Sequence, residues 1–192
     1  MSTINFAKRE ISFKIVYYGP AMSGKTTNLR YVYSTIPEKV KGDFTSIATE
    51  TERTLFFDFL PLELGSIKGF TIRLSLYTVP GQYIYKLTRK SVLRATDGIV
   101  FVADSQREKK QENIDSFQDM VNNLVEFGES IENMPIILQY NKRDLEDILT
   151  VEELQADLNP NKTYQYFEAV ATVGVNVMET LKAITKLVVQ KA

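Results

Sequence analysis

Short segments rich in β-branched and aromatic residues punctuate the chain and predict strands at residues 11–18, 55–60, 99–103 and 136–140. The last two are almost continuously apolar, as buried parallel strands are. Residues 70–77 alternate strictly between apolar and polar, which predicts a strand with one wetter face. We expect residues 63–66 to form the turn of a hairpin that joins this strand to the strand at 55–60.

Between these strands and in the C-terminal segment, apolar residues recur three or four positions apart, which is the spacing of one helix face. The three sets are Leu29, Val32, Tyr33 and Ile36; Ile114, Phe117, Val121, Leu124 and Val125; and Val177, Leu181, Ile184, Leu187 and Val188. Alternating strands and helices predict an α/β fold with a mostly parallel central sheet flanked by helices. Ligands of such sheets bind beyond the carboxyl ends of the strands, so we expect functional residues in the loops that follow them.

The first of these loops carries a phosphate-binding motif, G-x-x-x-x-G-K-[ST], from Gly19 to Thr26. A strand before the motif and a helix after it supply the required context. Backbone N–H groups at the start of a helix bind phosphate, while Lys25 adds charge and the Thr26 hydroxyl can bind Mg²⁺. The predicted nucleotide contacts of the loop are Gly19, Ala21, Met22, Ser23, Gly24, Lys25, Thr26 and Thr27.

A second motif, N-K-x-D, follows the strand at 136–140 and indicates the base. The Asp144 carboxylate could accept two hydrogen bonds from guanine, a donor pair that adenine lacks. Asn141 could bridge the base and the phosphate-binding loop, and the Lys142 stem could cover the base. Such a short motif is by itself more often a polar turn, but its position favours guanine. Downstream of a strand-like segment, Ala171 and Thr172 could supply a backbone N–H to the base oxygen.

Composition limits the alternatives. The 192 residues suit one domain, and 23 basic against 24 acidic side chains lack the bias of a nucleic-acid binder. No cysteine means no disulfide, thiolate metal site, prenyl or palmitoyl anchor, and no histidine excludes histidine-based catalysis. Neither a signal peptide nor an apolar run of membrane-spanning length is present. We expect a cytoplasmic protein without a lipid anchor that does not bind nucleic acid.

The order of these motifs resembles that of a Ras-superfamily small GTPase, and more narrowly the MglA family of bacterial polarity and gliding-motility GTPases. The matching segments are Ile15–Pro20, Glu52–Pro61, Leu76–Gln82, Asp97–Ser105 and Asn141–Leu145. Together they extend over nearly the whole chain. The resemblance implies a P-loop NTPase fold with a single Ras-like G domain at residues 1–192.

The resemblance also assigns catalytic roles. Gln82 would orient the attacking water, Lys25 would contact the transferred phosphate, and Arg53 would act as an arginine finger within the chain. Without the resemblance, Arg53 reads as a solvated charge. Thr54 would bind Mg²⁺ together with Thr26 and sense the γ-phosphate, and Gly81 would contact the same phosphate. GTP and GDP are then substrate and product, and Mg²⁺ is the cofactor.

Two positions depart from common patterns. Thr78 stands where most Ras-like proteins have an aspartate, a replacement characteristic of the MglA group; we expect weaker Mg²⁺ retention unless Thr78 is merely a polar strand end. Ala21 stands where both groups usually have glycine, and its methyl group is expected to slow hydrolysis. Four basic residues after Gln82 could form a partner-binding face, although a solvated helix surface is favoured: Lys86, Arg89, Lys90 and Arg94.

These observations predict a two-state GTPase switch for cell polarity and motility, with moving regions at residues 37–54 and 79–95. The resemblance implies a Roadblock-fold (MglB-like) activating partner, effectors that bind the GTP state, and recruitment to a cell pole. Phe56, Phe57 and Phe59 read as core residues, and the family resemblance implies that their strand changes register between states. Two alternatives are a nucleotide-dependent binding or scaffold module with negligible hydrolysis, and a P-loop kinase or ATPase, against which Asp144 argues.

Overall fold

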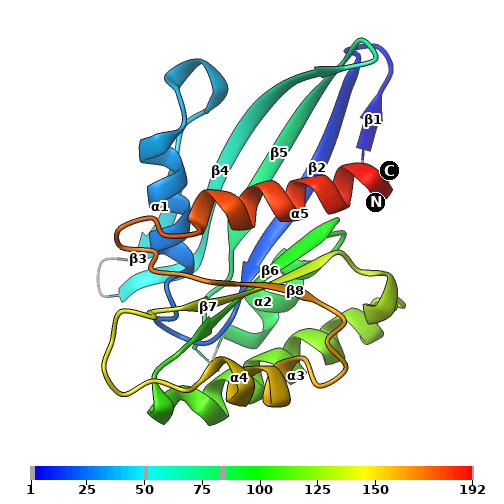
Figure 1. Cartoon of the computed structure of the whole chain (residues 1–192). Coiled ribbons are helices and arrows are strands. Elements are labelled where there is room, and N and C mark those ends of the chain that lie inside the picture. Colours follow the sequence, from blue (N-terminus) through cyan, green and yellow to red (C-terminus); the bar gives the residue numbers. More distant parts are fainter. Residues whose placement is uncertain (1–2, 50–51, 83–84, 192) are drawn as a thin grey trace.

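A single mixed sheet organises the molecule (Figure 1). The computed structural model describes the backbone of residues 3–49, 52–82 and 85–191, and their side chains except those of 47–49 and 52–56. Within this part, the strands are β1 (Thr3–Asn5), β2 (Glu10–Tyr18), β3 (Thr45–Thr49), β4 (Glu52–Ile67), β5 (Phe70–Thr78), β6 (Gly98–Asp104), β7 (Ile136–Asn141) and β8 (Gln165–Glu168). They are ordered β3-β4-β5-β2-β6-β7-β8, with β1 paired to β2 outside this path.

The sheet is parallel from β5 through β2, β6 and β7 to β8, and antiparallel at β1–β2, β3–β4 and β4–β5. The helices are α1 (Lys25–Thr35), α2 (Lys86–Leu93), α3 (Lys110–Glu126), α4 (Val151–Leu158) and α5 (Val177–Lys191). Short 3₁₀ turns occupy Glu38–Val40, Arg107–Lys109 and Ile131–Asn133. The predicted α/β class and mostly parallel sheet are confirmed.

Alternating side chains of the central strand divide the core into two layers. Ile15 and Tyr17 of β2 pack with α1 and α5 on one face, whereas Val16 and Tyr18 pack with α2, α3 and α4 on the other. Helices therefore cover both faces (Figure 1). In the described part of the chain, no helix combines the length and apolar character needed to cross a membrane.

The prediction of a turn at residues 63–66 is wrong. These residues belong to β4, where the register against β5 shifts between Glu63 and Ser66, and Gly65 has a φ of 100°. Glycine serves a bulge here, not a reversal. The chain turns instead at Lys68 and Gly69, both with positive φ.

Three described elements were not anticipated: β1, β3 and α4. A signal for α4 is nevertheless present in the sequence, because Thr150 and Glu153 form a capping box. The Thr150 hydroxyl accepts from the Glu153 N–H at 3.2 Å, and the Glu153 carboxylate accepts from the Thr150 N–H at 2.8 Å. Strands β1 and β3 carry no comparable local signal and depend on pairing with β2 and β4.

Candidate functional site

The phosphate-binding loop connects β2 to α1, as the motif requires. Gly24 precedes the first helical residue with a φ of 103°, and a side chain there would overlap the amide of Asn141. A side chain at Gly19 would likewise overlap the Val102 carbonyl. Both glycines are thus needed because neighbouring groups approach their backbone closely. Thr27 lies in the first turn of α1, and Met22 is exposed on the loop with a φ of 59°.

Lys25 is the first residue of α1, and its buried side chain reaches back to this loop. The Nζ donates to the main-chain oxygens of Gly19, at 2.9 Å, and Pro20. Burial, and then the positive charge of Arg89, lower the pKa of Lys25 to about 7, although Asp58 and Asp104 act in the opposite direction. Neutral carbonyls compensate an ammonium poorly, so a phosphate beside it would raise the pKa again and gain binding energy. Lys25 therefore suits an anionic ligand.

Asn141, the last residue of β7, connects three loops. Its Nδ2 donates to the Ser23 carbonyl at 2.8 Å, and its Oδ1 accepts from the Ala171 N–H at 2.9 Å. The predicted tie between the N-K-x-D motif and the phosphate-binding loop is therefore confirmed. Because Asn141 is buried, these bonds hold the 169–172 segment and the phosphate-binding loop in fixed relative positions.

The other residues predicted to contact the base surround Asn141. Asp144 is exposed just beyond β7, and Thr172 is exposed in the turn that follows β8. Lys142 has a φ of 66°, and its Nζ donates to Asp104 Oδ2 at 2.6 Å and to Gln106. The Lys142–Asp104 pair holds the Lys142 stem at the carboxyl ends of β6 and β7. The fold thus brings the residues predicted for the base to one edge of the sheet.

Asp58 is a buried carboxylate beside Thr26 that the sequence analysis did not single out. It is fully buried on β4, and its Oδ2 accepts from the Thr26 hydroxyl at 2.6 Å and from the Thr78 hydroxyl at 2.8 Å. Its Oδ1 accepts from Ser46 of β3 at 2.7 Å, while its N–H donates to Thr78 Oγ1 at 2.8 Å. A carboxylate of the neighbouring strand therefore contacts both Thr26 and Thr78.

The sequence does contain a signal for Asp58, since it is the one acidic residue of the apolar run 55–60. A lone carboxylate in a buried strand needs hydrogen-bonding partners, because an unpaired buried charge is very costly. Which partners it finds could not be read from the sequence, since they come from α1, β3 and β5. Thr78 is accordingly a buried strand end whose hydroxyl is bonded to Asp58.

The structure describes the side chains of only some of the residues predicted for catalysis. Gln82 is exposed after β5, and Gly81 packs so closely on the phosphate-binding loop that a side chain there would overlap the Ala21 backbone. Ala21 thus lies where the phosphate-binding loop meets the loop that contains Gly81 and Gln82. Arg53 and Thr54 belong to β4, but their side chains lie outside those that the structure describes.

The expected solvated surface on α2 is wrong for Arg89. Its side chain is buried, and its guanidinium pairs with Asp119 of α3 at 3.0 Å. Lys90 pairs with Glu126, and Arg94 is exposed at the end of the helix. The sequence pattern could not predict the burial of Arg89, because the packing of α2 on α3 decides which face of α2 is covered.

Comparison with known proteins agrees with this geometry. The model of the Ras family matches residues 14–190. "Mutual gliding-motility protein MglA" of Myxococcus xanthus is 53% identical over 98% of this chain and 96% of its own length. Human "ADP-ribosylation factor-like protein 4A" is 25% identical over 94% of this chain and 85% of its own length. "Ypt/Rab-type GTPase ypt7" of Schizosaccharomyces pombe is 25% identical over 95% and 85%, respectively.

The phosphate-binding loop, the Asn141 junction and the family match together define the class: the chain belongs to the Ras family of small GTPases. Within that family it is of the MglA type. Its reaction is therefore the hydrolysis of GTP.

Proposed function

We propose that this GTPase is a GTP/GDP switch that controls bacterial cell polarity and gliding motility, with hydrolysis stimulated by a Roadblock-type (MglB-like) activator. The observation that carries the biological part is the 53% identity, over almost the full length of both chains, to a protein named for gliding motility. The biochemical part rests on the residues gathered around the phosphate-binding loop. A single G domain at residues 1–192 would contain the whole switch.

Nucleotide binding divides between two ends of the site. Lys25 and the N–H groups of residues 19–27 would hold the phosphates, because a buried ammonium against neutral carbonyls favours an added anion. Asp144 would accept the guanine donors, and Ala171 and Thr172, which follow the neighbouring strand β8, would lie near the base oxygen. Asn141 supports both ends through its bonds to Ser23 and Ala171.

Mg²⁺ fits the oxygen donors of this site. Thr26 and Thr54 would be its protein ligands, and Asp58 would accept hydrogen bonds from the ligands and waters around it. An all-oxygen set of hydroxyls, a carboxylate and nucleotide phosphates is the chemistry that this hard cation prefers. When bound, Mg²⁺ would neutralise charge that builds up between the outer phosphates.

The hydrolytic step would depend on positioning more than on proton abstraction. Gln82 would orient the attacking water, and Arg53 would stabilise charge on the phosphoryl group from within the same chain. An activator would then need to hold the first switch so that both groups reach the γ-phosphate, without inserting an arginine of its own.

One strand unites the parts of the proposed switch. Strand β4 contains Arg53, Thr54 and Asp58, and Asp58 contacts Thr26 of the phosphate-binding loop. A change in the register of β4 would therefore move the arginine, the phosphate sensor and the carboxylate together. Residues 37–54 and 79–95 are the segments that we propose to move, ordered by the γ-phosphate and released on hydrolysis.

The same proposal includes partners and location. Effectors would bind the GTP state, and the protein would act in the cytoplasm and at a cell pole to which partners recruit it. An alternative, a nucleotide-dependent binding module with negligible hydrolysis, is favoured by the methyl group of Ala21, since this residue's backbone contacts Gly81, next to Gln82.

Single-turnover hydrolysis tests the proposal and separates it from that alternative. Arg53→Ala and Gln82→Ala should keep GTP and the activator bound, yet lose about 10³-fold or more of the stimulated rate. The two losses should be far from additive, because both groups serve one transition state. Arg30→Ala, which removes an exposed arginine of α1, is the matched control and should hydrolyse GTP at the parental rate. Full stimulation of Arg53→Ala would show that the arginine comes from elsewhere.

A further inference from the structure

Arg89 is a buried arginine that has no role in the nucleotide binding and hydrolysis proposed above. It lies on α2, and its side chain is only 5% exposed. Its Nε donates to Asp119 Oδ2 at 3.0 Å, while its Nη1 donates to the main-chain oxygen of Gln82. One guanidinium thus joins α3 to the backbone of the residue proposed to orient the water.

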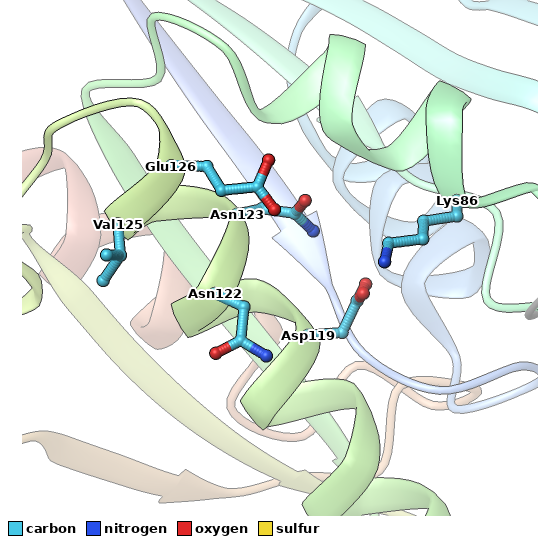
Figure 2. A pocket seen from close by; sticks show the side chains of 6 residues that line it. All are labelled: Lys86, Asp119, Asn122, Asn123, Val125 and Glu126. Atoms are coloured by element: carbon cyan, nitrogen blue, oxygen red, sulfur yellow. The ribbon is translucent and has the colours of Figure 1, made fainter.

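Asp119 extends this connection to the phosphate-binding loop. The same Oδ2 accepts from the Tyr18 hydroxyl at 2.6 Å, and Tyr18 directly precedes Gly19. Burial, together with the Asp119 charge, raises the pKa of Tyr18, so the phenol remains a neutral donor. Figure 2 shows Asp119 pointing from α3 toward α2, in the wall of a pocket of about 340 Å³.

The placement of these bonds distinguishes a positioning role from simple helix packing. A pair that only fastened α2 to α3 would need the Nε–Asp119 contact alone. Arg89 uses its second arm on the Gln82 carbonyl, outside both helices. Its two arms therefore connect α3 to the loop that follows β5.

We propose that Arg89 is a positioning residue for GTP hydrolysis, held by Asp119 and Tyr18, which fixes the backbone of Gln82 relative to the phosphate-binding loop. This inference rests on the proposed role of Gln82. An arginine has the planar fork needed to reach a carboxylate and a carbonyl at once, whereas a lysine offers a single nitrogen. Small displacements of a catalytic group cost large factors in rate, so loss of one arm should be visible.

The test is a double-mutant cycle of single-turnover GTP hydrolysis with the full chain and Mg²⁺. Arg89→Lys should slow hydrolysis about ten- to a hundredfold with nearly unchanged affinity for GTP. In a Gln82→Ala background the same substitution should change the rate little, because the side chain that it positions is gone. Arg94→Lys, at the exposed end of α2, is the control and should match the parent.

Each outcome decides a different claim. If Gln82→Ala hydrolyses GTP as fast as the parent, the proposed role of Gln82 fails. If Gln82→Ala is slow but Arg89→Lys is not, or if Arg89→Lys costs the same factor in both backgrounds, Arg89 does not position Gln82. Should Arg89→Lys fail to fold, Tyr18→Phe replaces it in the same cycle, with a smaller loss expected in the parental background only.

Discussion

The two edges of this site are held by different kinds of contact. At the base edge, beyond β7 and β8, Asn141 bonds to main-chain groups of two other loops. At the switch edge, formed by β4 and the carboxyl end of β5, Asp58 bonds to the side-chain hydroxyls of Thr26, Thr78 and Ser46. The base edge belongs to the parallel part of the sheet, and the switch edge adjoins its antiparallel part.

We infer that this difference separates base recognition from switching. Bonds between a buried amide and backbone groups need both loops in one arrangement, so they fix the two loops relative to each other at the base edge. A carboxylate that accepts from hydroxyls, in contrast, can exchange its partners if β4 slides, because hydroxyls rotate and find new acceptors. We infer that substitutions at the two edges have different effects. At the base edge they should change nucleotide affinity, and at the switch edge they should change Mg²⁺ dependence or the rate of hydrolysis.

The largest of the three expected effects lies at the base edge. Asp144→Asn should weaken GTP binding about ten- to a hundredfold, because a charge-assisted hydrogen-bond pair is lost, and should shift preference toward xanthosine nucleotides. Competition binding with both nucleotides measures this. Asp147→Asn, an exposed carboxylate of the same loop, is the control. Unchanged GTP affinity in Asp144→Asn would show that Asp144 does not bind the base.

A smaller effect is expected at the switch edge. Asp58→Asn keeps the shape but removes the charge beside Thr26, so about tenfold more Mg²⁺ should be needed to retain the nucleotide. Release of a fluorescent guanine nucleotide during a Mg²⁺ titration reports this, with the exposed Asp43→Asn as control. If the titration midpoint stays in place, Asp58 does not support the metal, and its bonds to Thr26 and Thr78 are purely structural.

The smallest effect is expected where the phosphate-binding loop meets the loop that contains Gly81 and Gln82. Ala21→Gly removes the methyl group from a loop against which Gly81 packs. Activator-stimulated hydrolysis should rise a few-fold in single-turnover measurements, while nucleotide affinity should change little. An unaltered rate would show that Ala21 does not hinder the approach of these two loops, and that the slow step lies elsewhere.

Local patterns determined much of this protein. Continuous apolar runs predicted β6 and β7, periodic apolar residues predicted α3 and α5, and the phosphate-binding and N-K-x-D motifs indicated a guanine nucleotide site. These predictions succeeded where the signal lies within one segment, because a buried strand or an amphipathic helix needs the same neighbours along the chain in any fold. The prediction that these motifs lie close together followed from the parallel sheet, because the loops after parallel strands meet at the carboxyl ends of those strands.

Other features depend on contacts between segments far apart in the sequence. The partners of Asp58 come from three different elements, Arg89 is covered by α3, and Gly65 forms a bulge because β5 continues beside it. A carboxylate or guanidinium has the same local sequence whether it is solvated or buried, and only packing decides which. The sequence by itself determined the class of ligand and the order of the elements; the tertiary structure decided which charges face one another around the phosphate end, because burial and pairing are properties of the assembled layers.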